Sequence, residues 1–388
     1  MQETEAGHIV LELAPCPGRF RSSEGSFITL ADGRIMLAYS KFTGGYRDDA
    51  TAVIVSRTSS DGGRTWTADD ELVVASEGAR NVMSTSLLRL ADGRAAMFYL
   101  VKHGWHDCRP VMRTSEDECR TWSPPQQVIA TPGYYVVNND RVVQLASGRI
   151  VVPAAWHPPA QGRDGEAGYG PGQATFFLSD DGGKSWRQST ITQLPIPTLW
   201  TGLQEPGVVE LGGERLFAFC RTDLGCHYGL HSSDGGLTWT EPFPTEFISP
   251  VSPMSIKRLP PGTQLGTVPQ SGTVPSCSPS CDTNRGQSQT AGLSPLLALY
   301  NDHSGRFPFD TVDRGRQPLV SVISRDDGAT WTNHRQVEAD LSRGYHYTAI
   351  HFTADGHVLL AYCAGPKGPG TQLNTLRVRR IEASWFAA

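Results

Sequence analysis

Short apolar segments alternate with glycine-containing turns along almost the whole chain. Apolar run, turn and apolar run is the pattern of a β-hairpin, and it occurs at Asp32-Gly33, Asp92-Gly93, Ser147-Gly148, Gly212-Gly213, Pro261-Gly262 and Asp355-Gly356. A third apolar segment follows each of the first five hairpins. The glycine and proline contents, 41 and 27 of 388 residues, are high and favour many turns and few long helices. The pattern therefore predicts a chain built mainly from short strands.

A second repeat, the Asp box Ser-x-Asp-x-Gly-x-Thr-Trp, follows the third apolar segment of each of these five units. It occupies residues 59–66, 115–122, 179–186, 232–239 and 324–331, with Cys119 replacing the glycine of the second copy and Ser185 the threonine of the third. Glycine and aspartate suit a tight turn, and tryptophan is a large apolar plug. We therefore expect the boxes to be structural turns whose tryptophans pack between neighbouring units.

Six units of four strands predict an all-β, six-bladed β-propeller with Asp-box turns. The sixth unit lacks its fourth strand, while the apolar run His8–Leu13 near the N-terminus has no partner in its own unit. Pairing these two chain ends would close the last blade and leave no free sheet edge. We expect residues 1–388 to form this single propeller domain, with a low-complexity loop insertion at about 264–294 on the side of the boxes.

Charge and composition exclude several classes of function. The net charge of −5 offers no basic surface for nucleic acid, and no apolar stretch reaches the roughly 18 residues that cross a bilayer. The N-terminus lacks the features of a signal peptide, so we expect a cytoplasmic protein, or a secreted one if a signal has been trimmed. Cys277 and Cys281 form the only close cysteine pair and have no second pair at zinc-site spacing. We expect no metal, no cofactor, and neither nucleic acid nor membrane as a partner; the sequence leaves the oligomeric state open.

The order of the strands places the candidate chemistry at one end of the propeller. Hairpins and boxes share one face, so the opposite face collects the residues before the first strand, after the second and before the third of each unit. There the innermost strands converge on a central depression. Polar residues recur at these positions, among them Arg21, Glu24, Asp48, Asp49, Arg141, Glu205, Arg221, Arg316 and Tyr347.

Clustered arginines at this face indicate an acidic small molecule. Guanidinium groups repel one another unless an anion or carboxylates balance them, and they bind a carboxylate in a bidentate manner. Cleavage of a glycosidic bond needs a proton donor and a nucleophile or base. A carboxylate nucleophile would be repelled by a substrate carboxylate on the reacting carbon, whereas a tyrosine hydroxyl activated by a glutamate would not.

The Asp boxes resemble those of the sialidase (neuraminidase) superfamily over nearly the full chain, and three segments are similar to the exo-α-sialidase site. Glu205–Leu211, followed by Arg221, resembles the segment of the tyrosine-activating glutamate and the second arginine of a carboxylate-binding triad. Arg316–Ser324 resembles the strand with the third arginine. Gly344–Ile350 is similar to the segment of the nucleophilic tyrosine. Of the two tyrosines in it, Tyr347 is preferred over Tyr345 because it lies nearer the apolar run.

The same resemblance implies an acid/base aspartate and a first arginine. Gly44–Asp49 is similar to the aspartate segment, with Asp48 as the first choice and Asp49 as the second. The family carries its first arginine in a Phe/Tyr-Arg-Ile-Pro motif, whereas this chain has Arg21 without the Ile-Pro and adds Glu24. Arg141 is the alternative source of that charge, unless it forms an ion pair with Asp140.

These residues favour an exo-acting, retaining sialidase-like glycoside hydrolase that cleaves a terminal α-linked nonulosonic acid from a sialylated or other acidic glycan. Tyr347 would attack, Glu205 would activate it, and Asp48 would be the acid/base. One alternative is a propeller glycosidase or lyase for another acidic glycan. The other is a carbohydrate-binding propeller without turnover, because propellers carry many unrelated functions.

Overall fold

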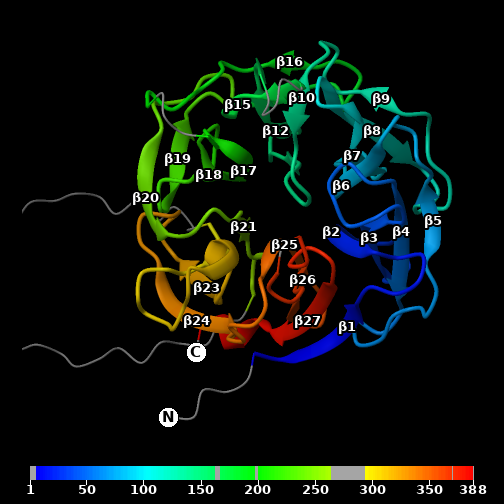
Figure 1. The fold of residues 1–388 in the computed structure, drawn as a ribbon, viewed down its shortest axis with the longest axis vertical. Coiled ribbons are helices and arrows are strands. Elements are labelled where there is room, and N and C mark those ends of the chain that lie inside the picture. Colours follow the sequence, from blue (N-terminus) through cyan, green and yellow to red (C-terminus); the bar gives the residue numbers. More distant parts are fainter. Residues whose placement is uncertain (1–5, 162–166, 197–199, 264–292, 369, 388) are drawn as a thin grey trace, which may run out of the picture.

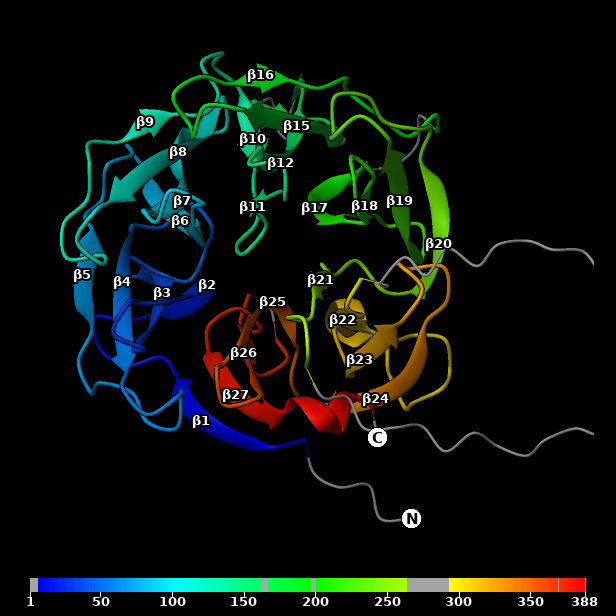
Figure 2. The same cartoon turned by 180° about the vertical axis from the view of Figure 1, so that it is seen from behind.

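The computed structural model describes residues 6–161, 167–196, 200–263, 293–368 and 370–387. Almost all of the expected insertion at 264–294 lies outside these residues, as do Cys277 and Cys281. The described chain consists of short strands and two 3-10 helices, η2 (Val312–Gly315) and η3 (Ala383–Ala387). None of its helices has the length and apolar character needed to span a membrane. Figures 1 and 2 show the sheets arranged radially around a central axis, which is the arrangement of a β-propeller.

Four of the sheets contain four antiparallel strands each. In three of these sheets the strands follow one another in chain order from the centre of the propeller outward. They are β2 (Arg21–Thr29), β3 (Ile35–Phe42), β4 (Ala52–Ser59) and β5 (Glu71–Val74); β17 (Gln204–Glu210), β18 (Leu216–Arg221), β19 (Cys226–Ser232) and β20 (Phe243–Ile248); and β21 (Ser255–Arg258), β22 (Leu296–Asn301), β23 (Leu319–Ser324) and β24 (Thr332–Glu338).

The fourth sheet joins the two ends of the chain. It contains β25 (His346–Phe352), β26 (His357–Cys363) and β27 (Leu376–Glu382), and its outermost strand is β1 (His8–Leu13). β1 pairs antiparallel with β27, from His8 opposite Arg380 to Leu13 opposite Leu376. The apolar run near the N-terminus thus finds its partner at the other end of the sequence.

Nine of the remaining strands form one sheet, so four blades rather than the expected six stand as separate four-stranded sheets. Its members are β6 (Asn81–Arg89), β7 (Ala95–Gly104), β8 (Asp107–Ser115), β9 (Gln126–Gln127), β10 (Tyr134–Val136), β11 (Val143–Gln144), β12 (Ile150–His157), β15 (Gln173–Ser179) and β16 (Arg187–Gln188). The cause of the correction is β10, which pairs antiparallel with β12 and also in parallel with β8, at Tyr134 opposite Cys108. A separate two-stranded ribbon consists of β13 (Pro159–Gln161) and β14 (Ala167–Tyr169).

Inner strands are buried on both faces because each sheet packs against its two neighbours. β3 and β7 are buried along almost their whole lengths, which explains why their sequences, IMLAYSKF and AAMFYLVKHG, are nearly continuous apolar runs without strict alternation. The clusters of buried side chains each draw on neighbouring sheets; one contains Val151 and Phe176 together with Val208 and Leu230.

The Asp boxes are turns held by their own side chains. In the first box the Asp61 carboxylate accepts hydrogen bonds from the backbone N–H of Thr65 at 2.9 Å and from its hydroxyl at 2.7 Å, while Ser59 Oγ accepts one from Gly63 N–H at 2.8 Å. Gly63 adopts φ +85°, a left-handed conformation that glycine adopts without strain. The expectation of a structural turn is therefore confirmed for this box.

The box tryptophan of β19–β20 packs between two sheets, as expected of a plug. The Trp239 ring stacks on Phe176 of β15, with ring centroids 4.0 Å apart. Replacing Trp239 with alanine should lower the free energy of unfolding by about 2 to 4 kcal/mol, because the truncation leaves a cavity at this contact while the ring is only half-buried.

Chemical denaturation with urea measures this effect. The matched control is Leu72→Ala, which truncates a side chain that is 62% exposed at the outer strand β5 and should change the free energy little. An unchanged midpoint for Trp239→Ala would contradict the plug role.

Candidate functional site

A left-handed residue interrupts the inner end of several innermost strands. Glu24 in β2, Ser84 in β6, Glu205 in β17 and Tyr347 in β25 have φ angles of +56°, +60°, +48° and +59°, and each sits at a register shift in the pairing with the next strand. A bulge of this kind turns one side chain out of the regular alternation and is common beside functional sites. The same device therefore directs four polar side chains toward the propeller axis.

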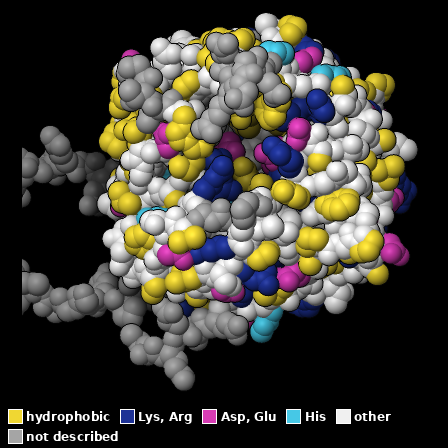
Figure 3. Space-filling view, in the orientation of Figure 1, with side chains coloured by type: hydrophobic (Ala, Val, Ile, Leu, Met, Phe, Trp, Pro, Cys, Tyr) yellow, Lys and Arg dark blue, Asp and Glu magenta, His cyan; other side chains and the backbone are white. Residues whose placement is uncertain are grey.

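These four side chains line one cavity of about 220 Å³ at the centre of the propeller. Asp48, Arg221, Arg314 and Arg316 also line it. Figure 3 shows basic and acidic side chains gathered around the central hollow of this face. The structure thus brings together residues from sheets that are far apart in the sequence, as the sequence analysis expected of a multi-blade site.

Tyr347, Glu205 and Arg221 form a hydrogen-bonded chain in this cavity. The Tyr347 hydroxyl donates to Glu205 Oε1 at 2.9 Å, and Arg221 Nη1 donates to both oxygens of the same carboxylate at 2.9 Å. Burial alone would raise the pKa of Glu205, but Arg221, together with Arg316 and the Tyr347 hydrogen bond, holds that pKa below its usual value. Burial, together with the Glu205 charge, raises the pKa of Tyr347 well above its usual range. The arrangement is a neutral phenol whose proton already points at an ionised carboxylate.

Arg316 is a buried cation that lacks a carboxylate partner among the described residues. The whole residue is only 4% exposed. Its Nε donates a hydrogen bond to the Val251 carbonyl at 3.3 Å. Burial, and then repulsion from Arg221, lowers the pKa of Arg316 to about 10. A buried charge without a counter-ion is costly, so this part of the cavity is prepared for an anion.

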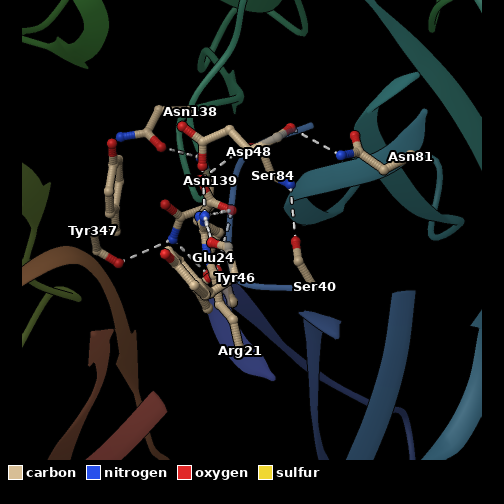
Figure 4. Close-up of polar contacts among 12 residues, drawn as sticks. Arg21, Glu24, Ser40, Tyr46, Asp48, Asn81, Ser84, Asn138, Asn139 and Tyr347 are labelled. Carbon is tan, nitrogen blue, oxygen red and sulfur yellow. Dashed lines mark hydrogen bonds and ion pairs between the residues drawn. The ribbon is translucent and has the colours of Figure 1, made fainter. Parts of the chain in front are cut away.

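Arg21 has its charge balanced within the protein. Its guanidinium donates to Asp48 Oδ1 at 2.5 Å, to Glu24 Oε2 at 3.1 Å and to Ser23 Oγ at 2.8 Å (Figure 4). It is 1% exposed and is not among the residues that line the cavity, whereas its two acidic partners are. Arg21 therefore lies behind Glu24 and Asp48.

Asp48 lies where the cavity meets a second, larger hollow. This outer groove has a volume of about 560 Å³ and shares Asp48, Arg314 and Arg316 with the cavity. The Asp48 side chain is 58% exposed. Its partial burial would raise its pKa, but Arg21, together with Lys102 and Arg316, lowers that pKa below its usual value. Asp49, the alternative to Asp48, lines only the groove, and its carboxylate lies 3.9 Å from Arg47 Nε.

Arg141 lies outside the cavity lining and binds neighbouring sheets. Its guanidinium donates to Ser255 Oγ at 3.1 Å and to the Met254 carbonyl. The ion pair with Asp140 that we considered is wrong, because the Asp140 carboxylate instead pairs with Lys257 at 2.7 Å. Asp140 also accepts hydrogen bonds from Ser26 Oγ at 3.0 Å and from the backbone N–H of Ile350 at 2.9 Å.

The segment Asn139–Arg141 is therefore a hub that ties four innermost strands together. Asn139 Nδ2 donates to the carbonyls of Gly25 and Tyr347 at 2.8 and 3.1 Å (Figure 4). Together with the contacts of Asp140 and Arg141, these bonds reach β2, β6, β21 and β25. The hub fixes the backbone of Tyr347 from the opposite side of the axis.

The competing tyrosine, Tyr345, belongs to the core. It is fully buried, packs in the cluster with Leu299 and Tyr362, and donates its hydroxyl to the Asp340 carbonyl at 3.3 Å. Tyr347 is the one of the two that lines the cavity.

Several cavity residues escaped the sequence analysis as site candidates. They include Tyr134 and Tyr169, whose rings stack with centroids 4.6 Å apart. Tyr169 ends the β13–β14 ribbon and Tyr134 begins a three-residue strand, so no periodic pattern marks them. Lys102, His157 and Arg314 lay on the expected face, but only their spatial convergence shows them to be part of the site. No group of three or more His, Cys, Asp and Glu residues in the described chain is arranged to hold a metal ion.

The chain is similar to known proteins in sequence and in fold. The model of the BNR repeat-like domain family matches residues 33–360. A sialidase of Bacteroides fragilis (strain YCH46) is 22% identical over 256 residues, which cover 63% of this chain and 37% of that sialidase. The chain thus matches little more than a third of the length of this relative.

Two solved structures share the fold over nearly the whole chain. The intramolecular trans-sialidase of Ruminococcus gnavus has a TM-score of 0.69 at 14% identity, covering 98% of each chain. The leech intramolecular trans-sialidase has a TM-score of 0.70 at 14% identity, covering 99% of this chain and 71% of the other. At these identities the likeness shows the fold alone.

The buried carboxyl of Glu24 gives a pH-dependent prediction. Burial, opposed by Arg21 and assisted by Asp48 and Glu205, raises the pKa of Glu24 from 4.5 to about 7. Between these two pH values the folded protein therefore binds more protons at this site than the unfolded chain, and its stability falls as the pH rises.

Glu24→Gln removes this titration. The free energy of unfolding of the variant relative to that of the natural protein should rise by about 3 kcal/mol between pH 4.5 and 7 and stay level above pH 7. Urea unfolding of both proteins over a pH series measures the difference. A difference that does not change with pH would show that Glu24 titrates normally.

Proposed function

The chain belongs to the BNR repeat-like domain family, and on that basis we propose that it is a sialidase-like glycosidase that releases a terminal α-linked nonulosonic acid from an acidic glycan. The observation that carries the proposal is the bond between the Tyr347 hydroxyl and Glu205, within a cavity that also presents Arg221 and Arg316. The similar proteins named as sialidases support the substrate class.

The first step uses Tyr347 as the nucleophile. The phenol oxygen attacks the anomeric carbon while its proton passes to the Glu205 carboxylate 2.9 Å away. The anomeric carbon of such a sugar carries a carboxylate, so a neutral phenol approaches it without the repulsion that a second carboxylate would meet. Arg221 keeps Glu205 ionised until it receives this proton.

Asp48, after it has taken up a proton from solvent, supplies the proton that the leaving oxygen needs. Its place between the cavity and the outer groove is where the bond between sugar and leaving group would lie. In the second step Asp48 takes a proton from water, the water oxygen displaces the tyrosine, and Glu205 returns its proton to the phenol oxygen. The configuration is retained because two displacements occur.

Arg316 and Arg221 hold the substrate carboxylate in this scheme, with Arg314 at the rim. Arg316 is the principal candidate because its guanidinium makes no ion pair with any described residue, whereas Arg221 already binds Glu205. Arg21 acts through Asp48 and Glu24, which it holds in place.

In this proposal we divide the nine-stranded sheet into two blades, β6–β9 and β10–β12 with β15 and β16, so that the propeller has six blades in all. β1 then closes the ring through its pairing with β27. Residues from the sheets of β2, β17, β21–β24 and β25 supply the reacting groups.

A different reaction, elimination by a histidine and a tyrosine, is the second candidate. His157 is buried and lines the same cavity. Its ring makes an edge contact with the Tyr169 ring, with the ring centroids 4.9 Å apart. Burial lowers the pKa of His157, which leaves the ring neutral and able to accept a proton. An unsaturated product that absorbs in the ultraviolet would favour this reaction.

Tyr347→Phe should abolish the release of an aryl group from an aryl sialoside. We expect kcat to fall by about 1000-fold or more, because the nucleophile and its proton are both lost. Fluorescence release gives kcat, and mass spectrometry identifies whether the sugar leaves as the free acid or as an anhydro form.

The matched control is Tyr345→Phe, two residues away. Its hydroxyl binds only a backbone carbonyl in the core, so turnover should stay close to that of the natural protein. Substantial turnover by Tyr347→Phe would end the assignment of the nucleophile.

Arg316→Met removes the unbalanced charge while keeping an unbranched side chain. KM for the aryl sialoside should rise by about 30-fold or more, since a buried charge contact is lost. Steady-state kinetics supply KM and kcat separately. An unchanged KM would mean that the substrate carboxylate binds elsewhere.

A further inference from the structure

The loop that carries Asp48 has few bonds of its own. Thr43 and Gly44 donate backbone hydrogen bonds to the Thr51 carbonyl at 2.9 and 3.2 Å, and Ala50 N–H bonds to the Arg47 carbonyl at 2.9 Å. Most of residues 43–51 are exposed or half-buried. A loop held only in this way would not fix a catalytic carboxyl to the fraction of an ångström that proton transfer requires.

Two buried side chains of the neighbouring sheet hold the backbone of this loop. Asn81, at the start of β6, donates through Nδ2 to the carbonyls of Asp48 and Ala50, both at 2.9 Å (Figure 4). Lys102, near the end of β7, donates from Nζ to the same Asp48 carbonyl at 3.3 Å. Asn81 and Lys102 are directly paired across β6 and β7, so their side chains act from one rigid position.

Burying the Lys102 ammonium in this position costs free energy. It is 1% exposed, and its hydrogen bonds go to neutral acceptors, the Asp48 carbonyl and the Tyr134 hydroxyl at 3.2 Å. The Trp105 ring, with its centroid 4.2 Å from Nζ, covers the charge. A neutral apolar side chain would fill this space without the penalty of burying a cation.

Arg21 also contacts this loop: its guanidinium donates to the Asp48 carboxylate and, at 3.4 Å, to the Tyr46 carbonyl. Arg21 thus holds the reacting end of Asp48, and Asn81 and Lys102 hold its main chain. The ammonium also favours the ionised form of Asp48 and adds to the effect of Arg21 in lowering its pKa. This charge effect opposes protonation of Asp48, so the help that Lys102 gives must come from the position in which it holds the loop.

We propose that Lys102, together with Asn81, is a positioning residue for Asp48: it fixes the Asp48 carbonyl so that the carboxyl stays between the cavity and the outer groove. The inference rests on the proposed function, in which Asp48 protonates the leaving oxygen. Its consequence is specific, because loss of a general acid slows the departure of a poor leaving group more than that of a good one.

Lys102→Met tests this role in the full chain. Kinetics are measured on sialosides with leaving groups from an activated phenol to a sugar alcohol. We expect kcat for the sugar alcohol to fall by about 10- to 100-fold, kcat for the activated phenol to change little, and KM to stay the same. An equal loss on every leaving group, or a change in KM alone, would overturn the proposal and make Lys102 a substrate contact.

Lys41→Met is the matched control. Lys41 lies in β3 of the adjacent sheet, pairs with Asp70 at 2.9 Å, and does not line the cavity. The same substitution there should leave the dependence on the leaving group unchanged.

Hydrogen exchange separates this proposal from the proposed function. In Lys102→Met, the backbone amides of residues 43–51 should exchange faster than in the natural protein and in Lys41→Met, whether or not the protein hydrolyses any sialoside. If the natural protein hydrolyses no sialoside, the proposed function fails. The exchange rates still test whether Lys102 holds the loop. Unchanged exchange rates in this loop would by themselves overturn the proposal that Lys102 is a positioning residue.

Discussion

The Asp140 carboxylate is the contact on which the geometry of the site most depends. It binds Lys257 of β21, Ser26 of β2 and the backbone of Ile350 in β25, and it is almost fully buried. A buried carboxylate is stable only when donors surround it, and here the donors come from different sheets. The inner strands must therefore meet at one place on the axis, two residues along the chain from Asn138, which lines the cavity.

The cavity follows the same rule of charge compensation only in part. Arg21 is balanced by Glu24 and Asp48, and Arg221 by Glu205. Arg316 keeps its charge without a described partner, and Lys102 is covered by neutral groups. Positive charge in excess of the acidic partners is what an anionic ligand would balance. The unpaired cations therefore tell more about function than the paired ones.

Strain is the second feature shared by the site residues. Glu24, Ser84, Glu205 and Tyr347 all adopt left-handed backbone conformations that glycine would adopt more easily. Each such residue costs free energy, and the packed sheets around it supply that energy. The cost accompanies a side chain that leaves the strand alternation and reaches the cavity, which links the stability of the sheets to the precision of the site.

The sequence by itself determined the repeated units, the Asp-box turns, the partner of His8–Leu13 at the far end of the chain, and the face on which Glu205 and Tyr347 meet. The turns and the apolar runs follow from local patterns, because they depend on neighbours a few positions away. The partner of His8–Leu13 and the shared face follow from the number and order of the strands that these patterns define. Only the tertiary structure decided that β10 joins two blades into one sheet, that Arg21 lies behind its acidic partners, that Arg141 belongs to the hub, and that Lys102 reaches the Asp48 carbonyl. These outcomes depend on how far a long charged side chain extends and on which acceptor lies at its end. Both are set by the packing of separate sheets, and no spacing along the chain records that packing.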